Sequence, residues 1–428
     1  MLEITIVSVV VGVILHFIND RLYIFYYLFL YFLLPFTITL LFDLELEDYN
    51  YLANRSPLYI MAIFAIELFK NKFQLRSLRP TLLLLLLFIY VLYGVISHGA
   101  PLTEYILHFF VSFLAPLYCC FNLFSWNQPD WEKLDRFIIF IFNTELILFF
   151  VQYFLGAFTL EFGEDSVLFS NASGTLSRGN TFASFLLLFL CYIVIRKDNM
   201  EIRVKWVYLL LGFLAILFSG VRTYMVCFVM FVPLSFFFKE TRVVKPIYGI
   251  IVCLTFLFLF FTMSSINERG YATKEADNPI ERQLYGLSNF TRGESVDEQS
   301  TMFLSLVVFT EYFVNNPLFG NWMLYTENSY DPVSPENENV MDAGLAVYLS
   351  DIGILGMTLY ILFQLYVYLM GADMLRKKQI LVLASYAIVT TYTDIGIFGG
   401  MFTCCILVLS NLLKWRNGEV DNYQMVEE

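Results

Sequence analysis

Long apolar stretches separated by short polar ones run along most of the chain. Many are long enough to cross a hydrocarbon layer of about 30 Å as helices that rise about 1.5 Å per residue. The pattern predicts an all-α polytopic integral membrane protein of about 12–13 transmembrane helices, because the first stretch also fits an interfacial helix and the last two fit one bent segment. The candidate spans are residues 4–18, 22–42, 57–70, 80–97, 104–124, 137–158, 179–195, 206–220, 223–238, 247–263, 344–370, 380–394 and 397–413.

One long polar interval, residues 264–343, interrupts the apolar pattern. It separates an N-terminal transmembrane bundle of about ten spans (1–263) from C-terminal transmembrane helices (344–413) and a cytoplasmic tail (414–428). Within this loop, residues 297–315 are predicted to form a helix that begins at Asp297 and ends before Pro317. Its apolar part of about 13 residues is too short to span, so we expect it to lie on the membrane surface or to be re-entrant. NPLFG then forms a turn, followed by an acidic, turn-rich flap.

Composition supports a membrane protein. The chain is 58% hydrophobic and only 15% charged, whereas a soluble domain carries about a quarter charged residues. The apolar run at 4–18 lacks a basic segment and a small-residue cleavage site, so we expect a retained helix and not a signal peptide. The net charge of −12 argues against nucleic acid as a partner.

The cysteines indicate neither a disulfide framework nor a metal site. All seven fall in apolar segments, which predicts buried structural thiols. There is no CxxC pair and no His/Cys cluster, so we predict no metal and no cofactor.

Basic residues predict the orientation. Nineteen of the 26 lie in short loops, or beside the first span, that alternation of the spans places on one side, and ten of these nineteen are lysines. By the positive-inside rule that side is the cytoplasm, so the long loop is extracytoplasmic. Six of the seven basic residues on the outer side are arginines: Arg55, Arg178, Arg222, Arg269, Arg282 and Arg292.

Arginine is suited to anionic substrates, because its planar guanidinium grips phosphate or carboxylate with a fork of donors. Arg178 lies in SGTLSRGNTFAS at the outer mouth of a predicted span, and Arg222 lies in FSGVRTYM between two apolar segments. A charge this close to hydrocarbon normally faces a polar cavity and has a partner. Two other interpretations of these arginines stay open. They could balance the charge of the acidic outer loops, or form a structural salt bridge with an intramembrane acid such as Glu145.

The remaining intramembrane acids admit two interpretations. Glu67, Glu104, Glu145 and Asp394 all fall inside or beside predicted spans. They fit a proton relay in a carrier, and they fit helix-packing groups equally well. The sequence does not choose between these.

Four short elements, in order, carry a family resemblance. They are SRGNTFAS, SGVRT, NPLFG within the long loop, and a Gly-x-x-Gly element in DAGLAVYLSDIGILG. In this order, between Arg178 and Gly356, the chain resembles the O-antigen polymerase and O-antigen ligase superfamily, and more specifically a Wzy-type repeat-unit polymerase. The span count and the position of the loop agree outside that region.

The resemblance implies a metal-independent membrane glycosyltransferase of the GT-C-like type, in the bacterial cytoplasmic membrane, with short helices in a catalytic outer loop. Its substrate would be an oligosaccharide on undecaprenyl pyrophosphate, and the growing glycan would be transferred to the next lipid-linked unit. Membrane lipid would surround it, and a chain-length regulator and a flippase are compatible partners. Outer arginines fit such a substrate: Arg178 and Arg222 as catalytic and pyrophosphate-binding groups, with Arg269, Arg282 and Arg292 as further substrate-binding groups.

The chain departs from the ligase pattern. Ligases of the superfamily carry a histidine near the end of the large loop, and this loop has none. Asp342 stands at the corresponding place, which favours a polymerase and makes Asp342 the candidate general base for the acceptor hydroxyl. Asp342 fits an N-cap of the following helix equally well. Arg282 and Gly293 also match an Arg-x10-Gly pattern described for the polymerases.

Two other functions stay open. A ligase would differ only in its acceptor. A flippase of the same lipid-linked units would also need cations for pyrophosphate, but it should show internal repeats and a charged central cavity. No repeat is visible, and the polar residues are gathered in one asymmetric loop.

Overall fold

The computed structural model describes the chain in separate ranges. These are residues 2–42, 45–69, 86, 89–90, 92–94, 96–97, 131–159, 172–176, 179–195, 202–219, 224, 228, 313–320, 349, 352–362 and 400–416. Over these ranges the chain is mostly helical, and they contain no strand. The all-α prediction is confirmed for the part of the chain that is described.

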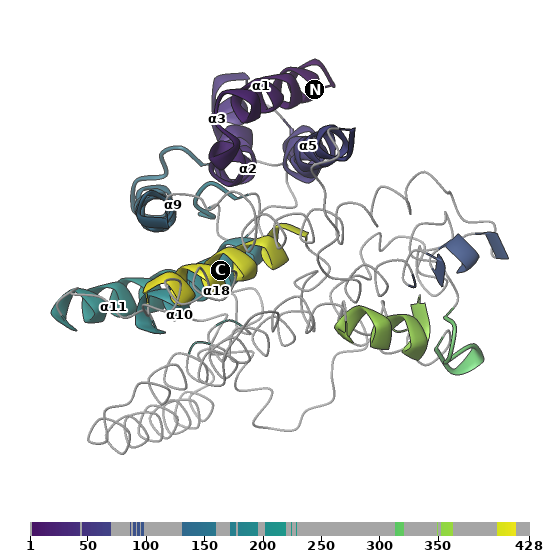
Figure 1. The fold of residues 1–428 in the computed structure, drawn as a ribbon. Coiled ribbons are helices and arrows are strands. Elements are labelled where there is room, and N and C mark those ends of the chain that lie inside the picture. Colours follow the sequence, from purple (N-terminus) through teal and green to yellow (C-terminus); the bar gives the residue numbers. More distant parts are fainter. Residues whose placement is uncertain are drawn as a thin grey trace, which may run out of the picture.

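The N-terminal helices form one group (Figure 1). Helix α1 packs against α5 and α2, and α4 packs against α2, α3 and α5. The bounds are α1 Leu2–Ile18, the 3-10 helix η1 Asp20–Leu22, α2 Tyr23–Phe32, α3 Leu34–Phe42, α4 Leu46–Arg55 and α5 Pro57–Phe69.

The predicted span 22–42 is bent in the structure. Helices α2 and α3 are inclined by 41° across Leu33. Pro35 lies in the first turn of α3, where it has no N–H to continue the hydrogen-bond ladder of α2. Helix α4 was not predicted, because its sequence LEDYNYLANR is polar on average and follows a group of acidic residues.

Four further helices pack together: α9 Trp131–Leu155, α10 Gly179–Ile195, α11 Ile202–Phe218 and α18 Gly400–Arg416. Helix α10 lies against all three of the others (Figure 1), and its bounds coincide with the predicted span 179–195. Helix α9 begins six residues before the predicted span 137–158 and ends at Leu155. The next residue, Gly156, has a φ of +60°, which suits a glycine that terminates a helix.

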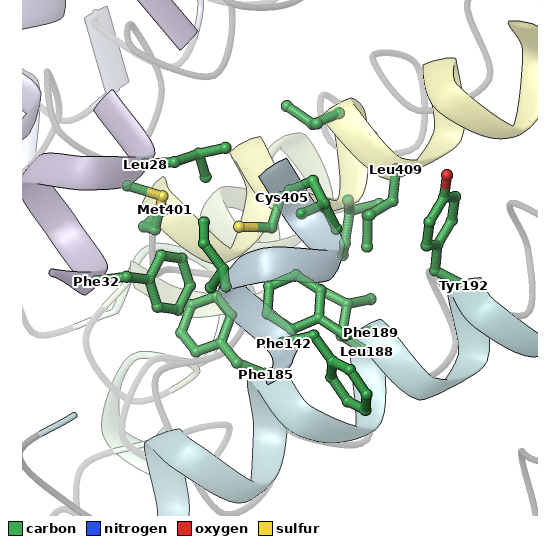
Figure 2. Close-up of a cluster of buried hydrophobic side chains, with 14 of the residues drawn as sticks. Leu28, Phe32, Phe142, Phe185, Leu188, Phe189, Tyr192, Met401, Cys405 and Leu409 are labelled. Carbon is green, nitrogen blue, oxygen red and sulfur yellow. The ribbon is translucent and has the colours of Figure 1, made fainter. Parts of the chain in front are cut away.

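The core lies where α2, α9, α10 and α18 meet (Figure 2). Phe32 of α2 makes an edge-to-face contact with Phe185 of α10 at 4.9 Å between ring centroids. Every side chain from Phe182 to Val194 is buried, so this part of α10 is covered on all sides. Such contacts stabilise the bundle through van der Waals packing.

Membrane-compatible helices are present among the described residues. Helix α9 is long and apolar enough to cross a membrane, and the bent pair α2–α3 passes the same test if it is one span. Shorter apolar helices include α1 and Ile352–Leu362. The number of spans, the GT-C-like arrangement, the domain boundaries and the sidedness of the loop stay predictions.

The buried-thiol prediction is confirmed where the structure bears on it. Cys191, Cys404 and Cys405 are buried thiols in α10 and α18. The other four cysteines lie outside the described residues.

Candidate functional site

The predicted site residues lie outside the described ranges. These are Arg178, Arg222, Asp342, Arg269, Arg282 and Arg292. The described chain comes closest to Arg178, with Leu176 and Gly179 on either side, and to Arg222, with Ser219 and Tyr224. The described residues that precede, follow and support these two arginines define the candidate site.

The segment 172–176, which precedes Arg178, is clamped against α9. The backbone N–H of Thr175 donates a 2.9 Å hydrogen bond to Oε2 of Glu145. The hydroxyl of Thr175 donates a second, short hydrogen bond to Oε1 of the same carboxyl. Glu145 is 2% exposed, so these bonds satisfy a polar group that would otherwise be costly to bury in an apolar helix.

Gln152 holds the same segment through its whole carboxamide. Its Oε1 accepts from the N–H groups of Ser173 and Gly174, at 2.9 and 2.8 Å. Its Nε2 donates to the carbonyl oxygens of Gly174 and Phe158, at 2.7 and 2.9 Å. An amide side chain has two donors and two acceptor positions, and Gln152 uses all four.

Gly174 lies at the closest approach between the segment and α9. Its φ is +66°, a conformation that residues with a Cβ rarely adopt. A Cβ at this position would lie 2.1 Å from Oε2 of Glu145 and 3.1 Å from Cδ2 of Phe182. The sequence thus places glycine where both the backbone conformation and the spacing require it.

Tyr49 of α4 supports the segment from the other side. Its hydroxyl donates a 2.7 Å hydrogen bond to the carbonyl oxygen of Thr175. Burial, with smaller contributions from Tyr31 and Glu145, raises the pKa of Tyr49 well above its usual value. The phenol therefore stays protonated and keeps its role as a donor.

Sequence reasoning missed Gln152 and Tyr49, although one signal was available. Glu145 and Gln152 are seven residues apart, which places both on one face of a helix. Of the two interpretations of Glu145, its contacts with Thr175 favour a packing role. The predicted alternative, a salt bridge from Glu145 to Arg178 or Arg222, is not tested because both arginines lie outside the described residues.

The NPLFG turn and the Gly-x-x-Gly element, residues 353–356, meet at a junction. The helix that contains Asn315 ends there, and residues 316–319 form the predicted turn, which is confirmed. The carbonyl oxygens of Pro317 and Leu318 accept hydrogen bonds from the N–H groups of Ile354 and Leu355, at 2.9 and 3.1 Å. These donors belong to the first turn of the helix Ile352–Leu362, where N–H groups lack a partner within the helix.

Both glycines of the element are needed for this contact. Gly353 has a φ of +64°, and a Cβ there would lie 2.5 Å from the carbonyl oxygen of Leu318. A Cβ on Gly356 would lie 2.6 Å from the ring of Tyr90. The Tyr90 hydroxyl is 2.9 Å from the carbonyl oxygen of Phe319 and 2.6 Å from that of Ile352, and its single proton serves one of them at a time.

The described long-range contacts are compatible with the predicted sidedness. Tyr49 and Thr175 belong to connections that the charge pattern assigns to the outer side. Tyr192, near the end of α10, donates a 2.5 Å hydrogen bond to Asp135, near the start of α9, and both lie beside predicted inner loops. Which side is the cytoplasm stays a prediction.

No group of three or more His, Cys, Asp or Glu side chains gathers in the part of the chain that the structure describes. Comparison with protein-family models, with curated proteins and with solved structures gave no match to this chain. The resemblance to the polymerase superfamily therefore stays a hypothesis, supported by the motifs and their contacts alone.

Proposed function

We propose that this chain is a polysaccharide polymerase of the cytoplasmic membrane. It joins oligosaccharide repeat units carried on undecaprenyl pyrophosphate, and it transfers the growing glycan onto the next lipid-linked unit at the outer face. The O-antigen ligase and the lipid-linked oligosaccharide flippase are the alternatives that the test below separates.

The contact between NPLFG and the Gly-x-x-Gly element is the observation that carries the proposal. These elements were singled out in the sequence as parts of one family pattern, and Gly320 and Gly353 are 33 positions apart. In the structure a Cβ on Gly353 would lie 2.6 Å from the backbone nitrogen of Gly320. Gly320 and Gly353, which stand on either side of Asp342 in the sequence, therefore lie in close contact.

The proposed chemistry needs no metal. The acceptor hydroxyl attacks the anomeric carbon of the donor glycan, and its proton passes to the carboxylate of Asp342. The bond from that carbon to the pyrophosphate oxygen breaks, and undecaprenyl pyrophosphate leaves with the added negative charge. The guanidinium groups of Arg178 and Arg222 stabilise that charge as it develops.

The length of surface glycan in a strain that lacks this chain tests the proposal. A polymerase predicts that long polymer disappears while single capped units still reach the surface, and that the wild-type gene restores the polymer. Loss of all outer-face units would instead identify a flippase, and accumulation of polymer that is not attached to its acceptor would identify a ligase.

Reconstitution separates the reaction from other cellular effects. The purified chain in proteoliposomes, supplied with lipid-linked units extracted from the deletion strain, should produce a ladder of polymer and release undecaprenyl pyrophosphate. The ladder should persist in a metal chelator. Proteoliposomes that produce no ladder, with protein that is folded and correctly inserted, would contradict the proposal.

A further inference from the structure

Two buried polar residues of α9, Glu145 and Gln152, have no part in the chemistry proposed above. We propose that they are positioning residues for the transfer: they hold the segment 172–176 in place and thereby fix the entry of the chain into α10, where Arg178 immediately precedes Gly179. This inference rests on the proposed function, and it assigns to Glu145 a hydrogen-bonding role that does not depend on its ionisation.

Four successive backbone donors of the segment, from Ser173 to Leu176, are engaged. The N–H groups of Ser173 and Gly174 donate to Gln152, and that of Thr175 donates to Glu145. The N–H of Leu176 donates to the carbonyl oxygen of Ser173 at 3.1 Å, which closes a turn. The segment cannot move from α9 without breaking several buried hydrogen bonds, each of which is costly to leave unmade.

The same face of α9 also holds the start of α10. Phe149 lies four residues after Glu145 and three before Gln152, so the three side chains form a row along the helix. The ring of Phe149 stacks on that of Phe182, with centroids 4.7 Å apart and planes inclined by 5°. One row of side chains therefore anchors both the segment 172–176 and the first turns of α10.

The linker between these two anchors is short. Only Ser177 and Arg178 join Leu176 to Gly179. An arginine that must meet a pyrophosphate gains from such an anchored start, because a misplacement of about 1 Å can lower a rate ~100-fold.

The hydrogen-bonding role separates this proposal from a proton relay. Thr175 donates one proton to each oxygen of Glu145. A glutamine at position 145 retains one acceptor for the N–H, and its amide can donate to the Thr175 hydroxyl once that hydroxyl rotates. Glu145→Gln therefore preserves the hydrogen bonds by which residues 145 and 152 hold the segment 172–176, called the clamp below. The same substitution abolishes any proton relay that needs an ionisable group at position 145.

The activity test uses the full-length protein in proteoliposomes with lipid-linked units from the deletion strain. At saturating donor, Glu145→Ala and Gln152→Ala should lower the rate at least about 10-fold, while Glu145→Gln stays close to wild type. A Glu145→Gln variant as inactive as Glu145→Ala, or alanine variants with the wild-type rate, would overturn the inference.

A labelling test reports on the clamp without the reaction. Ala172 is 2% exposed, so Ala172→Cys should react slowly with a membrane-impermeant maleimide, and at least about 10-fold faster when Glu145→Ala and Gln152→Ala are added. An unchanged labelling rate would show that the two residues do not hold the segment. If the cysteine of Ala172→Cys is protected and the wild-type protein does not polymerise, the proposed function is refuted, whereas the role of Glu145 and Gln152 in holding the segment stands.

Discussion

Tyr49 on α4 donates a 2.7 Å hydrogen bond to the carbonyl oxygen of Thr175, which lies 126 positions later in the chain. Both residues are buried. Tyr49 packs with Phe36 and Ala53, and Tyr31 and Leu148 cover this small cluster. A short polar helix that looked like a connection between spans thus supports the segment that leads to Arg178.

Removing that hydroxyl should weaken the fold. Tyr49→Phe keeps the ring and leaves the buried carbonyl of Thr175 without this donor, which we expect to cost about 1–3 kcal/mol of stability. The measurement is the midpoint of thermal unfolding of the purified protein in detergent. Tyr51→Phe is the matched control on the same helix, because Tyr51 is only partly buried and its ring faces the guanidinium of Arg55 at 4.7 Å. Equal midpoints for the two variants would contradict the assigned role of Tyr49.

Helix α10 and the turn could be predicted because local rules govern them. The uninterrupted apolar run at 179–195 coincides with the bounds of α10. Asn316-Pro317 and Gly320 have the turn chemistry that ends a helix, and the turn is there. The bend at Leu33 had a local signal in Pro35 that the apolar pattern concealed.

The clamp could not be predicted in the same way. Glu145 and Gln152 share a helix face, which the sequence shows, but the sequence does not say which loop meets that face. Their partners lie 21 to 30 positions away, and Tyr49 lies 126 positions from Thr175. Such pairings depend on how the helices pack, and helix periodicity carries no information about them.

Gly353→Ala should disrupt the junction between the NPLFG turn and the helix Ile352–Leu362. The new Cβ would lie 2.5 Å from the carbonyl oxygen of Leu318, so backbone atoms would have to move, in addition to the strain of φ +64°. Gly156→Ala is the matched control, because its φ is +60° but no atom lies within 4 Å of its Cβ. We expect Gly156→Ala to cost only the strain of about 1–2 kcal/mol.

Polymer formation and unfolding midpoint together separate the two glycine variants. Gly353→Ala should lower both, and Gly156→Ala should lower the midpoint slightly while polymer still forms. If Gly353→Ala behaves like Gly156→Ala in both assays, the close approach at the junction has no consequence and the interpretation of the Gly-x-x-Gly element is wrong.

Tyr90→Phe should loosen the same junction from its other side. The hydroxyl of Tyr90 is within hydrogen-bond distance of the carbonyl oxygens of Phe319 and Ile352. Its loss should lower the stability by about 1–3 kcal/mol, seen as a lower unfolding midpoint. Tyr93→Phe is the control, since Tyr93 is 56% exposed and contacts the ring of Phe319 at 6.4 Å without a hydroxyl role at the junction. A Tyr93→Phe variant that loses as much stability as Tyr90→Phe would rule out the junction as the cause.

The arginines test the proposed chemistry most directly. Arg178→Ala and Arg222→Ala should abolish polymer formation while the protein still inserts into the membrane, because each removes a cation that would stabilise the leaving pyrophosphate. Arg→Lys at either position should rescue poorly, since an ammonium keeps the charge but loses the planar fork that binds phosphate through two hydrogen bonds.

Arg55→Ala is the control: it removes a basic residue of the same predicted side whose guanidinium lies over the ring of Tyr51, and it should leave polymer length unchanged. Polymer length on gels, normalised to the protein found in the membrane, is the measurement. Full activity of both alanine variants would refute the assigned role of Arg178 and Arg222 at the pyrophosphate. Equal loss in Arg55→Ala would show that the effect comes from net charge at the membrane surface.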